Sequence, residues 1–246
     1  MTNEELEELI ISIMQASQDR VDELSEYYGS LLEAEFNKLV SLLTVHNRFW
    51  IYTPEGQVAL NSIRRRLRDV YSRYEQDARN TLEEALEEVT EIVGHFQNAE
   101  GEGYREEEEN FSIVIDEALQ NFLTVFNSLL SRMEMLLQTL PAQTEPDEAF
   151  KELIKLGRQS KSFLRNVLKT QLSTIINNSL FSTYLAAGVE KLKWDTRPEA
   201  TVSGTCNECL GYASGGLNND GIYLVEDAPA MPAHNHCACV YLPVTP

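Results

Sequence analysis

Four long stretches of the sequence repeat apolar residues at alternating intervals of three and four, and this rhythm limits the possible fold more than any other feature. Such spacing places apolar side chains along one face of an α-helix, as in a helical bundle or a coiled coil. Packing in a bundle core explains the stripe without any further role. In the first stretch, residues 3–46, the rhythm is carried by Leu6, Ile10, Ile13, Leu24, Tyr28, Leu31 and Ala34.

The other three stretches predict helices over about residues 53–96, 107–140 and 147–191. Thr53 is a suitable N-cap for the second helix, and Pro54 suits its first position. Glycine and glutamate are concentrated in residues 99–110, which predicts a loop or hinge, and Gly157 predicts an interruption of the fourth helix. The expected fold class is therefore mainly α, with an elongated antiparallel helical bundle or coiled coil over residues 1–160.

The composition changes after about residue 190, where glycine, proline and asparagine become frequent and the long helical repeats stop. We expect short strands that start at Trp194, cover residues 222–225 and cover residues 240–244. This tail has too few apolar residues for a core of its own, and small units of that kind are held by metals or cross-links. Residues 161–246 are therefore predicted to form a small, metal-stapled α+β domain.

All four cysteines and two of the four histidines lie within residues 206–239. A Cys-x-x-Cys pair is followed, after a loop rich in glycine and asparagine, by a His-x-x-Cys pair with the same offset. Two such pairs can meet around one tetrahedral ion and close a structural site. Thiolate and imidazole ligands suit zinc better than magnesium or calcium. The preferred ligand set is Cys206, Cys209, His234 and Cys237.

Two further side chains in this region are candidate ligands. Cys239 is the first substitute for one of the preferred four, and His236 is a sixth candidate. Disulfide bonds or metal-free thiols are the alternative explanation, and disulfides would suit a secreted protein. The N-terminus is acidic, whereas a signal peptide begins basic and then turns apolar. We therefore expect folding in a reducing cytoplasm, where cysteines more often bind metals.

The excess of acidic residues argues against nonspecific binding to nucleic acid. The formal net charge is −19, and an acidic surface repels phosphate backbones. No apolar run is long enough to cross a membrane, so we expect neither a nucleic acid nor a membrane as partner. The one basic run, residues 64–68, is explained by pairing with acidic helices, and contact with an acidic partner or a phosphate is the alternative.

Several residues of the last third occur in an order that matches a known family. In chain order they are Lys169, Thr170, Gln171, Asn177, Gly188, Trp194, Asp195, Thr196, Cys206, Cys209, Pro232, His234, Cys237 and Cys239. Over about residues 165–246 the chain thus resembles the C-terminal domain of phage minor head proteins, the phage Mu F-like head morphogenesis family. Lys169 and Gln171 stand where that family usually has Arg and Glu, and Ala238 stands where it has Arg. The cysteine and histidine frame is intact.

The resemblance implies a virion component and not an enzyme, so no catalytic residue is expected. Its implied role is a structural or assembly protein of a tailed-phage head, a minor capsid or head morphogenesis protein. It would associate with the portal vertex or the capsid interior, in several copies per vertex, and would be in the host cytoplasm during assembly. The implied partners are phage portal and capsid proteins.

The alternative function is a zinc-dependent nuclease or hydrolase that uses His234 and His236. Histidine can act as a general base, and a spare ligand would let one zinc position open to water. Closed ligation by four protein side chains, which the spacing favours, leaves no such open position.

Overall fold

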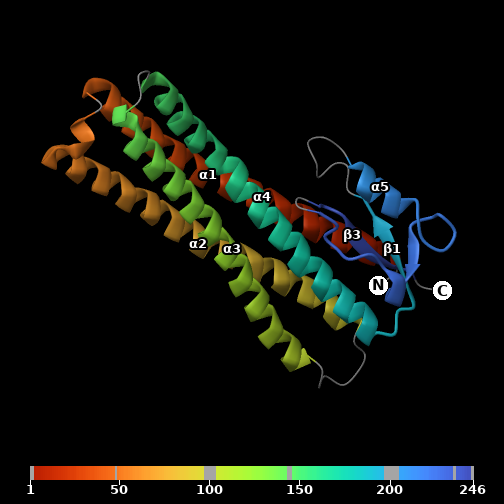
Figure 1. Ribbon diagram of the computed structural model, residues 1–246. Coiled ribbons are helices and arrows are strands. Elements are labelled where there is room, and N and C mark those ends of the chain that lie inside the picture. The colour runs from red at the N-terminus through yellow and green to blue at the C-terminus, as the bar shows by residue number, and fades with distance from the viewer. Residues whose placement is uncertain are drawn as a thin grey trace. The chain divides into compact units, whose positions relative to one another are not determined.

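The computed structural model describes residues 3–47, 49–96, 104–142, 146–196, 205–234 and 237–244. Figure 1 shows that long helices make up most of this part of the chain. The long helices are α1 (Asn3–Val45), α2 (Pro54–Phe96), α3 (Tyr104–Thr139) and α4 (Pro146–Ala186). The predicted mainly α fold class is confirmed. None of the helices described here is both long and apolar enough to span a membrane.

Two of the predicted features of these helices are wrong. α3 begins at Tyr104, so part of the predicted acidic loop is helical, and residues 97–103 lie outside the described residues. α4 is not interrupted at Gly157. A Cβ built at Gly157 would lie 2.9 Å from the Cβ of Phe36. Gly157 therefore allows α4 to approach α1 closely and does not end the helix.

The remaining elements are short. They are η1 (Trp50–Tyr52), η2 (Leu140–Ala142), β1 (Lys191–Asp195), α5 (Asn207–Ala213), β2 (Ile222–Leu224), η4 (Val225–Asp227) and β3 (Val240–Val244). The strands form an antiparallel sheet in the order β2-β1-β3, which confirms the small α+β C-terminal part. β1 starts three residues before the expected Trp194. The sequence does not predict α5, because seven residues are too few to show a helical repeat.

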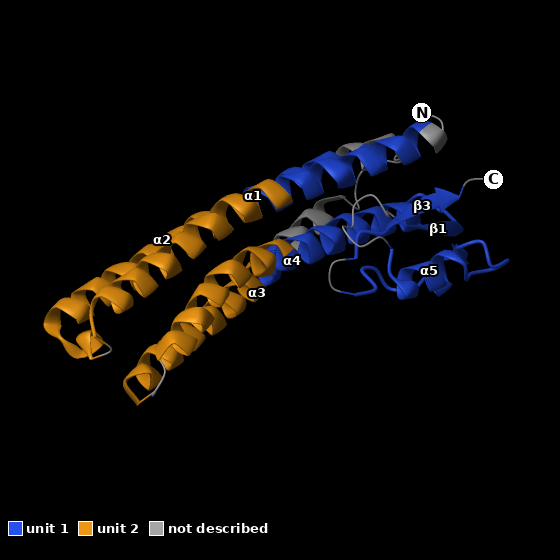
Figure 2. Cartoon of the chain, turned by 90° about the horizontal axis from the view of Figure 1, so that it is seen from above, with its two compact units in different colours: residues 1–21, 79–118, 166–246 blue, residues 22–78, 119–165 orange. Residues whose placement is uncertain are grey.

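Contacts divide the chain into two compact units, which Figure 2 colours separately. Unit 1 consists of residues 1–21, 79–118 and 166–246, and unit 2 of residues 22–78 and 119–165. These units are defined by compactness in space. The division into domains 1–160 and 161–246 along the chain stays a prediction.

Unit 2 is a four-helix bundle with antiparallel neighbours. Ion pairs join α2 to both of its neighbours, because Arg66 Nε lies 2.7 Å from Glu35 Oε2 on α1 and Arg64 Nε lies 2.6 Å from Glu134 Oε1 on α3. α4 is tied to α1 by Arg165, whose guanidinium donates to both carboxylate oxygens of Asp22. The two pairs made by Arg64 and Arg66 support the interpretation of the basic run as a helix face paired with acidic neighbours.

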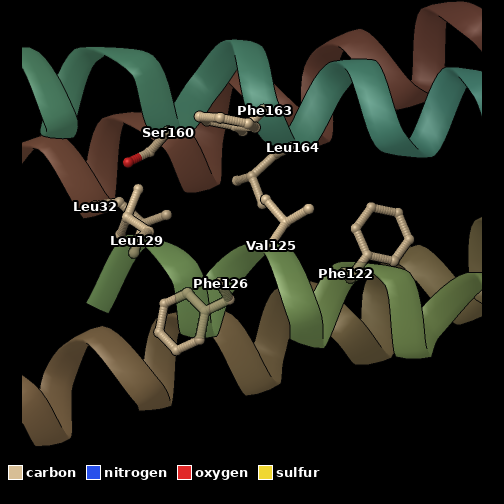
Figure 3. Close-up of a pocket in the computed structure, with 8 residues that line it drawn as sticks. All are labelled: Leu32, Phe122, Val125, Phe126, Leu129, Ser160, Phe163 and Leu164. Carbon is tan, nitrogen blue, oxygen red and sulfur yellow. The ribbon is translucent and has the colours of Figure 1, made fainter. Parts of the chain in front are cut away.

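The core of unit 2 is apolar. Tyr74 is fully buried, its ring meets that of Phe122 edge to face, and its hydroxyl donates to the backbone oxygen of Leu164. A small cavity of about 20 Å³ remains where Leu164 of α4 and Val125 of α3 point toward one another (Figure 3). Its one polar lining side chain, Ser160, donates back to its own helix. A water there would lack polar partners, so the cavity belongs to the packing of the core.

In unit 1, α4 ends at a glycine that turns the chain back toward β1. Gly188 has a φ of 70°, and the N–H of Val189 donates to the oxygen of Tyr184 at 2.9 Å. This arrangement is a Schellman cap, which needs the left-handed conformation that glycine adopts easily. α4 therefore ends before the expected residue 191, and this cap places the sheet beside α4.

Side chains of α4 close the outer edge of β3. Asn177 accepts a hydrogen bond from the N–H of Tyr241 at 3.2 Å and donates to the oxygen of Cys239 at 3.1 Å. Tyr184 donates to the oxygen of Tyr241 at 3.2 Å. Two residues further along the same edge, Pro243 has no N–H to leave unpaired. Open strand edges can pair with other chains, so α4 both seals this edge and anchors the C-terminal segment.

Candidate metal centre

α5 presents the first cysteine pair. Cys206 is the N-cap of this helix, and its Sγ accepts a hydrogen bond from the N–H of Cys209 at 3.4 Å. One helical turn then brings the second thiol to the same side. Cys206 is exposed and Cys209 is buried, so one thiol of the pair lies at the surface and the other in the interior.

His234 lies against this pair, although it is far away along the chain. Its Nε2 is 3.0 Å from the Sγ of Cys206 and 3.1 Å from the Sγ of Cys209. The three ligand atoms all lie within 4.8 Å of one another. The structure therefore brings together three of the side chains that the sequence analysis selects as metal ligands.

A second group of ligand atoms is formed by Cys209, Cys237 and Cys239, all of them buried. The Sγ atoms of Cys209 and Cys237 are 3.8 Å apart. A tetrahedral zinc ion with Zn–S bonds of about 2.3 Å would separate two of its sulfurs by about 3.8 Å. The two sulfurs thus already have the spacing of ligands to one ion.

Each of the two groups can hold a metal ion, and Cys209 belongs to both. The five proposed ligands therefore gather in one region of unit 1. Which four of them would bind a single ion stays a prediction. His236, the sixth candidate, lies outside the described residues.

The thiols do not share negative charge equally. The pKa of Cys237 is lowered to about 5, chiefly because the Cys239 thiol hydrogen-bonds to its sulfur. Burial raises the pKa of Cys209 to about 12, and the pKa of Cys206 is lowered by the N–H of Cys209. Charging all of these neighbouring sulfurs is unfavourable without a cation among them. A divalent metal ion would supply that compensating charge.

An aromatic cluster packs against α5, the helix that begins at the first cysteine pair. Trp194 of β1 is 1% exposed, and its ring centroid is 4.7 Å from that of Tyr212 on α5 and 5.6 Å from that of Tyr241 on β3. The three elements that carry or flank the ligands therefore share one small packed core. α4 covers the other side of this core, because Asn177 and Tyr184 hydrogen-bond to the backbone of Cys239 and Tyr241.

No family model, curated protein or solved structure matches the chain. Any functional assignment therefore depends on the residues of the chain itself.

Sequence analysis assigned no contacts to the residues that attach this site to α4. Asn177 was selected only as part of the family resemblance, and Tyr184 was not selected as a site residue. A buried asparagine within an apolar helix face must find hydrogen-bond partners, and that rule could have drawn attention to Asn177. Its partners could not be named, because they are backbone groups 62 and 64 positions away.

Proposed function

We propose that the chain is a structural protein of a tailed-phage head, a minor capsid or head morphogenesis protein, in which one zinc ion staples the C-terminal segment to its unit. The observation that carries this proposal is the convergence of the residues in the family resemblance. Asn177 is bonded to the backbone of Cys239, and Cys239 shares a ligand group with Cys209. Residues that carry the resemblance and also meet in space support one shared structural unit over a chance order of residues.

The donor set favours zinc in a structural role. Three thiols and an imidazole are soft ligands of the kind that closed, four-coordinate zinc sites use. The region offers five candidate ligands for four positions, so protein atoms can fill the coordination shell without water. A site of that kind contributes folding energy and leaves no open position for catalysis.

The expected partners are the portal and capsid proteins of the same phage, and the expected location is the head interior or the portal vertex. The net charge of −19 supports an assembly protein that must not adhere to packaged DNA. Several copies per vertex would follow from the symmetry of that site.

Co-expression with the portal and major capsid proteins of the same phage tests the proposal. We expect the native chain to co-purify with the portal protein or with assembled heads. We expect Cys209→Ser to lose this association together with its zinc. The matched control is Leu210→Ser, because Leu210 is the next residue of α5 and is 48% exposed. A native chain that binds neither protein nor heads would contradict the assignment.

A zinc-dependent nuclease or hydrolase is the second candidate, and one observation favours it. Cys206 is exposed and His234 is only partly buried, so one side of the ligand group can be reached from solvent. Zinc-loaded native chain and His236→Ala should be incubated with DNA and with a phosphodiester substrate. Hydrolysis by the native chain that His236→Ala loses, with zinc content unchanged, would favour the enzyme.

A further inference from the structure

The thiols of Cys206, Cys209 and Cys237 form a row that leads from the surface into the interior of unit 1. The Sγ atoms of Cys206 and Cys209 lie within 4.8 Å of each other, and those of Cys209 and Cys237 are 3.8 Å apart. Cys209 and Cys237 are each 2% exposed, whereas Cys206 is exposed. Cys209 therefore lies between a thiol that solvent reaches and one that it does not.

These sulfurs have a second chemistry besides metal binding. Metal ligation needs thiolates, whereas a disulfide leaves no thiolate to bind an ion, so the two states exclude one another. The 3.8 Å between the Sγ atoms of Cys209 and Cys237 must shorten to about 2.05 Å in a disulfide. A partial rotation of either side chain about its Cα–Cβ bond can supply a shift of that size. The two buried thiols are therefore close enough to be oxidised as a pair.

Access decides which thiol reacts first with a disulfide from solution. Cys206 is the exposed member of the four cysteines, and the other three are buried. A buried thiol reacts directly only when the structure around it opens locally. The N–H of Cys209 donates to the Sγ of Cys206 at 3.4 Å, which holds the exposed sulfur at the start of α5 beside its buried neighbour. Cys206 is therefore the entry point for an oxidising disulfide.

The buried pair is the favoured end of such an exchange. A Cys206–Cys209 disulfide would close a loop of four residues and would keep one sulfur exposed to reductants. A Cys209–Cys237 disulfide would join positions 28 apart, and a cross-link over a longer loop removes more conformational entropy from the unfolded chain. It would also be buried, out of reach of reducing thiols. Both effects favour passage of the bond from Cys206 inward.

We propose that these cysteines form a thiol–disulfide exchange site for a small disulfide such as oxidised glutathione. The Cys206 thiol attacks that disulfide, forms a mixed disulfide and releases one glutathione thiol. Cys209 then displaces the second glutathione thiol from Cys206, and Cys237 finally displaces Cys206 from Cys209. In sum, the thiols of Cys209 and Cys237 are oxidised to one disulfide, and oxidised glutathione is reduced to two thiols that take up the two protons. The Cys206 thiol is restored.

This exchange goes beyond the proposed function and does not depend on it, because it needs neither zinc nor a head protein. Its product links α5 to the segment that leads into β3, which are the two parts of the chain that carry the candidate metal ligands. A chain that has lost its metal would thus obtain a covalent link between the same two segments.

The test uses the full-length chain, reduced, treated with a chelator and exposed to oxidised glutathione in the absence of oxygen. Free thiols are alkylated at intervals, and the chain is cleaved after acidic residues. Glu208 and Asp220 then separate Cys206, Cys209 and Cys237 onto three peptides. We expect the chain to become lighter by two hydrogen atoms and the peptides of Cys209 and Cys237 to be cross-linked, with fragmentation assigning the sulfurs.

Two variants test the order of the steps. Cys206→Ser should slow formation of the Cys209–Cys237 link on the order of tenfold or more, because the buried thiols then depend on local opening. Cys237→Ser should stop at the Cys206–Cys209 disulfide. The matched control is Leu210→Ser, since Leu210 is a residue of α5 with 48% exposure, and it should react at the native rate.

The peptide map of the native chain decides the proposal even if a variant does not fold. A native chain that ends with Cys206 bonded to Cys209, with Cys237 bonded to Cys239, or with glutathione still attached would overturn the exchange. Oxidation of folded Cys206→Ser at the native rate would overturn the role of Cys206 as entry point.

The failures of the two proposals are distinguishable. A chain that binds zinc and head proteins but forms no Cys209–Cys237 link would overturn the exchange alone. A chain that forms this link at the expected rate but binds neither zinc nor a head protein would uphold the exchange and contradict the proposed function.

Discussion

Unit 2 and the C-terminal segment of unit 1 are stabilised in different ways. In unit 2, every helix contributes large buried side chains, such as Phe36, Leu67, Phe122 and Leu153, and burial of this kind stabilises by about 25 cal/mol per Å². The segment that follows β1 has short elements, and its buried side chains include three cysteines. A periodic apolar pattern makes a bundle stable without cross-links, whereas we propose that the short C-terminal segment depends on a bound metal ion and on packing against α4.

The largest effect should come from Cys209→Ser, because Cys209 belongs to both ligand groups. We expect loss of the metal and of order 10 kcal/mol of local folding free energy, the magnitude of structural zinc in small domains. Hydrogen exchange should accelerate in residues 205–234 and 237–244 and stay native in unit 2. Leu210→Ser is the control. Native protection of both regions in Cys209→Ser would remove the contrast between them.

The next largest effect should come from Asn177→Ala, which tests whether α4 anchors β3. Asn177→Ala leaves the N–H of Tyr241 and the oxygen of Cys239 without their side-chain partner in a buried place. Each unsatisfied group is unfavourable, so we expect a loss of roughly 2–4 kcal/mol. Metal content should stay native, because Asn177 is not a ligand. Chemical denaturation is the measurement, and Asn178→Ala, the exposed neighbour, should change little. Equal stability of the two variants would show that α4 does not anchor β3.

A smaller effect is expected from overpacking in unit 2. A Cβ at Gly29 would lie 2.5 Å from the Cβ of Lys161 and 2.7 Å from its Cα. Gly29→Ala should therefore lower the stability of unit 2 by about 1–3 kcal/mol, although alanine favours helices. In α5, Gly211→Ala meets nothing within 4 Å, and should be neutral or slightly stabilising. Calorimetry of both variants decides the matter, and a stabilised Gly29→Ala would refute the close approach of α1 and α4.

The smallest effect should come from the ion pairs that join the helices of unit 2. Arg165 and Asp22 bond at 2.6 and 2.8 Å, but their side chains are 34% and 37% exposed. Solvent screens such pairs, so a double-mutant cycle with Arg165→Ala and Asp22→Ala should give a coupling of about 0.5 kcal/mol, and less in high salt. A coupling of several kcal/mol would mean that charge, rather than apolar burial, holds the bundle.

The same contrast explains what could be predicted from the sequence. The bounds of α1 and α2 were predicted to within a residue or so because long periodic segments and the Thr53-Pro54 start are local signals. The predicted interruption of the fourth helix at Gly157 was wrong. Glycine occurs both at helix ends and at close contacts between helices, and only the position of Phe36 on α1 distinguishes the two cases.

In the C-terminal segment, the ligand types were predictable from their spacing, and the structure gathers them into two groups. The role of Asn177 was not predictable, because it depends on which backbone groups reach α4 across the fold. α5 was not predicted, because its seven residues carry no helical repeat.

We propose that a bound metal ion, in addition to the packing around Trp194 and against α4, is required to hold the C-terminal segment. The most direct test of this central claim is native mass spectrometry of the chain purified without chelator, before and after chelation, with hydrogen exchange on the same samples. We predict one zinc ion per chain, and we predict that its removal exposes residues 205–234 and 237–244 while the helices of unit 2 keep their protection. A chain that carries no metal as purified, or a segment whose protection is unaltered by chelation, would contradict the account.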